Sequence, residues 1–244
     1  SVSLYQVDDI SMSAVLSLAS VPSLHSLKIS RCTFIVEPVL WEHCLERNNV
    51  KTLQFNNCNW FNWCVLFPNL SVVNVADIDA ADVDAIVQHC VFVAKVEIKF
   101  GKGVLTDACV DRMCGNWRCI SELFLHFDPA ISVCTEGQVR KLVSGCPSLT
   151  AFSAPFPFSA LDTLTYPPGY TGHRLRTLNI ECADGETVRT LVSLCPYLHT
   201  LSLRSTGGEN TVGEALSCIP GSSVKSLRLD YEDLCAFCCY STPA

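Results

Sequence analysis

The chain has 244 residues, of which 49% are apolar, so it can bury a substantial hydrophobic core. Its net charge of −7, with no cluster of lysine and arginine, argues against nucleic acid as a partner. Its most apolar stretch, residues 90–100, is interrupted by Lys95, Glu97 and Lys99, so we expect no membrane span. Because the first residue is a serine and no signal-like segment follows, we expect a piece of a longer protein.

A six-residue frame returns along the chain: an apolar residue, two others, an apolar residue, a polar residue and an apolar residue. In residues 24–29 the apolar positions are Leu24, Leu27 and Ile29, and their alternation with polar neighbours predicts a short strand with one buried face. A period in the twenties predicts a solenoid, here of about ten repeats. The frame begins at intervals of 20 to 29 residues, at Val2, Leu24, Val50, Leu70, Val93, Ile120, Leu149, Leu175, Leu198 and Val224.

Two copies of the frame are degenerate. The first has Val2, Tyr5 and Val7 at its apolar positions, and the copy that begins at Leu149 has a small residue, Ala154, at the last one. A run of prolines and aromatic residues follows Ala154, so we expect an irregular segment at residues 155–174 within a single domain of residues 1–244.

The stretches between the strands carry apolar residues at helical spacing, such as Val83, Ile86 and Val87. In several copies a proline lies two residues ahead of the next strand's first apolar residue, where it ends the helix and favours extended backbone. Four aspartates crowd the start of one helix, and we expect them to cap its free N–H groups. Their order does not match that of a helix-loop-helix calcium site: Asp77, Asp79, Asp82 and Asp84.

These features resemble the leucine-rich repeat family, in particular the cysteine-containing subtype found in F-box-type ubiquitin-ligase adaptors. The resemblance rests on the frame, on Cys32 and Cys58 three residues after their strands, and on the Cys-Pro-x-Leu phrases at Cys146 and Cys195. It implies an α/β solenoid shaped as a curved horseshoe. A parallel β-sheet would line the concave face, and helices or irregular segments would form the convex face.

The sixteen cysteines follow the phase of the repeat. Cysteines that recur at equivalent positions stack as small buried hydrophobes, so we expect reduced thiols and a cytoplasmic or nuclear protein. Oxidised cysteines would instead favour an extracellular receptor or adhesion ectodomain. The cluster of Cys235, Cys238 and Cys239 has no second matching pair for zinc, so we expect no metal and no cofactor.

The sequence carries no recognisable catalytic motif. It has no Gly-x-Ser-x-Gly elbow, no phosphate-binding glycine loop before a helix and no His-Glu-x-x-His. We therefore expect a protein that is not an enzyme and that binds through the polar face of its strands.

The residues expected to bind a partner lie on two neighbouring strands and on two late ones. Phe124 is a large apolar side chain at an outward position, between charged neighbours, which is typical of an interface anchor. Arg204 and Arg228 lie in adjacent late copies and could hold a carboxylate or an acidic peptide. The complete predicted set is Lys95, Glu97, Lys99, Glu122, Phe124, His126, Arg204 and Arg228.

The leading hypothesis is a non-catalytic scaffold that binds a protein partner on its concave sheet face. The resemblance adds a more specific role, the substrate-recognition part of a ubiquitin-ligase-type adaptor. An extracellular ectodomain is one alternative, and a regulator of a small GTPase is another. The sequence leaves the oligomeric state open.

Overall fold

The computed structural model describes residues 1–35, 49–56, 58, 66–101, 105–126, 134–154, 174–182, 192, 195–205, 217 and 223–231. Residues 155–173 of the proline-rich segment and the cysteine cluster at residues 235–239 lie outside the described residues. The predictions made for those two segments are therefore not addressed by the structure.

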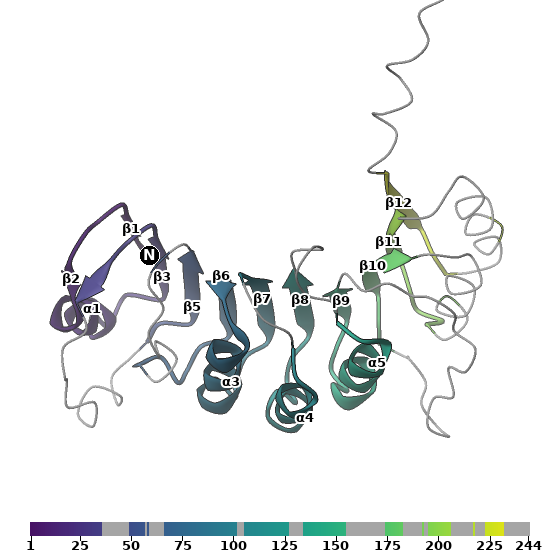
Figure 1. The fold of residues 1–244 in the computed structure, drawn as a ribbon, viewed down its shortest axis with the longest axis horizontal. Helices are drawn as coiled ribbons and strands as arrows, with labels where there is room; N and C mark the ends of the chain where they lie inside the picture. The colour runs from purple at the N-terminus through teal and green to yellow at the C-terminus, as the bar shows by residue number, and fades with distance from the viewer. Residues whose placement is uncertain are drawn as a thin grey trace, which may run out of the picture.

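The described chain has a mixed α/β fold built on a ten-stranded sheet whose strands follow one another in chain order (Figure 1). Every neighbouring pair is parallel, so each connection returns across the sheet before the next strand begins. A second sheet has two short strands, β2 (Ile10–Ser11) and β4 (Phe34–Ile35). The ten strands are β1 (Val2–Tyr5), β3 (Ser26–Ser30), β5 (Thr52–Asn56), β6 (Val72–Ile78), β7 (Lys95–Phe100), β8 (Glu122–His126), β9 (Ala151–Ala154), β10 (Thr177–Cys182), β11 (Thr200–Ser205) and β12 (Ser226–Tyr231).

Helices form a second layer along the sheet. α3 (Ala80–His89), α4 (Asp107–Asn116) and α5 (Glu136–Gly145) lie in a row on the outer side of the curved row of strands (Figure 1). α1 (Met12–Ala19) precedes them in the chain. Each helix begins at a side-chain cap that accepts hydrogen bonds from the first free N–H groups: Ser11, Asp79, Thr106 and Thr135.

The strand register places the apolar frame positions opposite one another. Leu27 pairs with Leu53, and this row continues through the sheet to Leu227. Alternate residues of each strand turn to one side, so the row faces the core while its neighbours face outward; it is buried from Leu27 to Leu201 and partly buried at its two ends. The row contains Val2, Leu27, Leu53, Val73, Val96, Leu123, Phe152, Leu178, Leu201 and Leu227.

The prediction for the first copy of the frame was wrong. Val2 pairs with Leu27 and Leu4 with Ile29, so Val2 occupies the second apolar position of the frame and not the first. Tyr5 and Val7, which were expected to be buried, are 57% and 40% exposed. Both alignments place apolar residues two apart, and the pairing with β3 decides between them.

A second buried row lies where the chain turns from each helix into the next strand. Cys90, Cys146 and Cys195 are each at most 5% exposed at this position, as the repeat phase predicted. Trp117 takes the equivalent position after α4 and is fully buried. Its indole Nε1 donates a hydrogen bond of 3.1 Å to the carbonyl oxygen of Cys90, which links successive turns of the chain.

Candidate protein-binding face on β7 and β8

Six of the predicted binding residues lie side by side on two neighbouring strands. The register pairs Lys95 with Glu122, Glu97 with Phe124 and Lys99 with His126. Between them along the strands, the intervening residues are fully buried: Val96, Ile98, Leu123 and Leu125. The six predicted residues therefore share the face of the sheet that is turned away from the core, as the alternation predicted.

Lys95 joins the charged and apolar parts of this face. Its Nζ lies 2.7 Å from Oε2 of Glu122 and 5.3 Å from the centre of the Phe124 ring. A cation over a half-buried ring contributes about 0.5–1 kcal/mol at sites open to solvent. These two contacts hold the ammonium group beside Phe124 and leave the ring half-buried on the face.

Glu97 connects three strands. Its Oε2 accepts a hydrogen bond of 2.9 Å from Nδ2 of Asn74 on β6, and its Oε1 lies 3.5 Å from Nε2 of His126 on β8. The contact with His126 becomes an ion pair when the ring is protonated. The carboxylate is therefore held in place by its neighbours, which lowers the entropy cost of presenting it to a partner.

Asn74 was not among the predicted binding residues, although it orients Glu97. The sequence feature that could have identified Asn74 is its place in the frame, which is the same as that of Glu97 and Phe124 in the next two copies. The strand register then makes the three residues neighbours across the sheet. We name the group of Asn74, Lys95, Glu97, Lys99, Glu122, Phe124 and His126 the β7–β8 face.

The two late arginines are not direct neighbours. Arg204 on β11 pairs with Asp230 on β12 and with Glu181 on β10, whereas Arg228 pairs with Ser202. The two arginines therefore lie on a diagonal of the sheet, and the two positions beside Arg204 are acidic.

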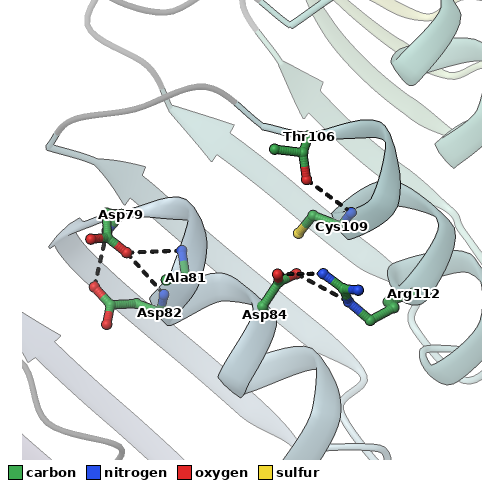
Figure 2. Close-up of polar contacts among 7 residues, drawn as sticks. All are labelled: Asp79, Ala81, Asp82, Asp84, Thr106, Cys109 and Arg112. Atoms are coloured by element: carbon green, nitrogen blue, oxygen red, sulfur yellow. Dashed lines mark hydrogen bonds and ion pairs between the residues drawn. The ribbon is translucent and has the colours of Figure 1, made fainter.

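Three of the four aspartates act at α3: Asp79 and Asp82 cap the helix, and Asp84 forms an ion pair with the next helix (Figure 2). Oδ1 of Asp79 accepts hydrogen bonds from the N–H groups of Ala81 and Asp82, and Oδ2 of Asp82 accepts from the Asp79 N–H at 3.0 Å. Asp84 forms a two-pronged ion pair with Arg112 of α4. Asp77 has a positive φ of 61° at a bulge in β6. Within the described residues, no group of three or more His, Cys, Asp and Glu is arranged to hold a metal ion.

The capping arrangement predicts a pH-dependent change in stability. Burial, with a smaller contribution from the adjacent Asp79, raises the pKa of Asp82 to about 6, although the hydrogen bond from the Asp79 N–H opposes the shift. The folded state therefore favours protonated Asp82. The contribution of protonated Asp82 to the free energy of unfolding is therefore complete below about pH 4, and it is lost as the pH rises through about 6.

We expect Asp82→Asn to be more stable than the unmodified chain above about pH 6, by at most about 1 kcal/mol because solvent screens this half-exposed group. The difference should shrink towards pH 4, where the aspartate is neutral. Urea unfolding of both proteins between pH 4 and 8 measures it. A difference that is constant over this range would contradict the expectation.

The cysteines that the structure describes are free thiols, and most of them are buried. Burial raises the pKa of Cys134 to about 12 and that of Cys195 to about 11. Burial and the nearby Asp84 carboxylate together raise the pKa of Cys109. A raised pKa keeps these groups protonated at neutral pH, so they pack as small apolar side chains and are poor nucleophiles.

No family model matches this chain, and no curated protein shows significant sequence similarity to it. None of the helices in the described part of the chain is long and apolar enough to cross a membrane. The function is therefore inferred from the residues and geometry described above.

Proposed function

We propose that this chain is a leucine-rich repeat solenoid and that its β7–β8 face is a non-catalytic binding surface for another protein. The observation that carries the proposal is Phe124, a half-buried aromatic ring on an outward sheet face, with the Lys95 ammonium over the ring and the ordered carboxylate of Glu97 on the paired residue of β7. Interface anchors combine such a ring with surrounding polar groups that exclude water once the partner is bound. The intervals of the sequence frame and the parallel strand order support the repeat assignment.

The charges of the face favour specificity over raw affinity. An exposed ion pair such as Lys95 with Glu122 contributes little by itself, about 0–1 kcal/mol. Its charges, fixed beside those of Glu97 and Lys99, select a partner whose own charges are complementary and reject others. We infer a partner with an apolar side chain that packs on Phe124 and with both acidic and basic groups around it.

The resemblance to cysteine-containing repeats supports a more specific proposal. In this proposal, the chain belongs to a ubiquitin-ligase-type adaptor in the cytoplasm or nucleus, and the β7–β8 face binds the substrate protein. The buried free thiols favour this reading over an extracellular ectodomain, since reduced cysteines are typical of intracellular proteins.

The test of the proposal is Phe124→Ala. We expect it to weaken partner binding by roughly 10- to 30-fold, because truncating an interface anchor costs about 1.4–2 kcal/mol. Stability should change much less, since the ring lies outside the buried core. Affinity capture from an extract of the source cells, followed by titration of the captured partner, measures the effect.

Phe92→Ala is the matched control, because Phe92 is 65% exposed and lies outside the β7–β8 face. A genuine partner is retained by the unmodified chain and by Phe92→Ala and is lost with Phe124→Ala. Retention of the same proteins at equal affinity by all three would refute the proposed face.

A further inference from the structure

The residues that immediately precede the strands form a row along one edge of the sheet. The backbone N–H of each donates to the carbonyl oxygen of its predecessor at 2.8 Å: Arg176 to Thr150, His199 to Arg176 and Lys225 to His199. Neighbouring members of the row are therefore spaced by about the 4.8 Å that separates hydrogen-bonded strands. We name Thr150, Arg176, His199 and Lys225 the pre-strand row.

This row concentrates basic groups in an acidic protein. Arg176, His199 and Lys225 follow one another without a carboxylate between them, although the net charge of the chain is −7. Arg174, two residues before Arg176, adds another guanidinium at the same edge. Both arginines are exposed, so their side chains are accessible from solvent.

A depression of about 760 Å³ opens at this edge and is lined by Thr150, Arg174, Arg176, Tyr197 and His199. We name it the pre-strand pocket. Its volume falls within the range of pockets that hold small molecules and is much larger than a bare ion requires. It therefore has room for an anionic group together with the side chain that carries it.

The hydrogen bonds of the lining residues show which groups can recognise a ligand. The Thr150 hydroxyl donates to the carbonyl oxygen of Ser121 at 3.0 Å. Nδ1 of His199 donates to the carbonyl oxygen of Tyr197 at 2.6 Å, which leaves Nε2 as a donor in the protonated ring. The two guanidinium groups supply the principal donors to a ligand.

We propose that the pre-strand pocket binds a phosphoryl group, a phosphate monoester on a side chain of a protein partner. Two guanidinium groups, each with several N–H donors in a plane, match the three oxygens of a dianionic phosphate monoester better than the two oxygens of one carboxylate. The Tyr197 ring, on a residue that is 55% exposed, provides an apolar wall beside them. Lys225, next in the row, favours an acidic residue adjacent to the phosphorylated one.

This proposal rests on the proposed function only in placing the phosphate on a protein, and it uses a different surface from the β7–β8 face. The probes are three fluorescein-labelled nine-residue peptides that differ at the central position, with phosphotyrosine, tyrosine or glutamate there, each followed by aspartate. Fluorescence polarisation at 150 mM salt measures their affinities. We expect the phosphopeptide to bind at least 10-fold more tightly than the other two.

The double variant Arg174→Gln/Arg176→Gln should weaken phosphopeptide binding by at least 10-fold while the far-ultraviolet circular dichroism is unchanged. Lys51→Gln is the matched control, because Lys51 is an exposed cation at the equivalent pre-strand position ahead of β5 and is distant from the pocket. It should bind as the unmodified chain does. An equal loss in both variants would indicate diffuse charge attraction and would overturn the proposal.

Two further binding measurements distinguish the pre-strand pocket from the β7–β8 face and a phosphopeptide from a free anion. Phe124→Ala should retain phosphopeptide binding, so failure of the β7–β8 face and failure of the pre-strand pocket are distinguishable. Inorganic phosphate and O-phospho-L-serine serve as competitors. If inorganic phosphate bound as tightly as the phosphopeptide, the pocket would be a site for a free anion and the peptide proposal would be wrong.

Discussion

Replacing Trp117 with alanine is expected to lower the free energy of unfolding by about 3–5 kcal/mol, the usual cost of removing a large buried aromatic side chain. Trp117 is fully buried at the turn between α4 and β8. The substitution leaves a cavity and also removes the Nε1 donor to the Cys90 carbonyl oxygen. Urea unfolding followed by circular dichroism measures the loss.

Two further variants separate these contributions. Trp117→Phe retains most of the buried ring but not the donor, so it should cost about 1–3 kcal/mol for the unsatisfied carbonyl and the smaller volume. Phe92→Ala removes an aromatic side chain that is largely exposed and should change stability by no more than about 0.5 kcal/mol. If Trp117→Ala lowered the free energy of unfolding by less than about 1 kcal/mol, the packing of Trp117 at this turn would not be a major source of stability.

Gly145→Ala is expected to destabilise the protein, although alanine is the better helix former by about 1 kcal/mol. A Cβ at position 145 would lie 2.5 Å from Sγ and 2.7 Å from Cβ of Cys114 on the neighbouring helix. Cys114 is itself held by a hydrogen bond of 3.4 Å to the Lys141 carbonyl oxygen. Helices α4 and α5 must therefore move apart, and we expect a net loss of about 1–2 kcal/mol.

Gly115→Ala is the control for helix propensity, because nothing lies within 4 Å of a Cβ built at that position. It should stabilise the protein by about 0.5–1 kcal/mol. Combining Gly145→Ala with Cys114→Gly removes the clashing atoms, so the two effects should be strongly non-additive. The steric explanation fails if Gly145→Ala stabilises the protein as much as Gly115→Ala does.

The position of the strands illustrates what a repeated pattern can predict. From the frame that begins at Leu24 onward, each strand of the large sheet begins two residues after the first apolar residue of a frame. The copy at Val2 was misaligned by three residues because residues 2–7 satisfy the alternation in either alignment. Only the hydrogen bonds to β3 distinguish the two, and those involve residues more than twenty positions away.

The candidate sites also divide into features that the local sequence pattern predicts and contacts that depend on strand pairing. Period-two alternation was sufficient to place Phe124 and Glu97 on the outward face, whereas the contact of Lys95 with the Phe124 ring depends on the pairing of β7 with β8. The sequence placed Arg204 and Arg228 in adjacent copies, and the register adds that their positions are diagonal neighbours. The pre-strand pocket was missed, because its lining residues come from three separate turns of the chain.

From the second copy of the frame onward, the sequence by itself determined where the strands begin, which of their positions are buried and which face each turns outward, because these follow from the local geometry of an extended chain. It also determined that cysteines recur at a buried turn. The tertiary structure decided which strands are neighbours in which register, and hence which side chains meet. Register depends on hydrogen bonds and packing between residues distant in sequence, so the β7–β8 contacts, the burial of Trp117 against Cys90 and the basic pocket emerge only when the strands are assembled.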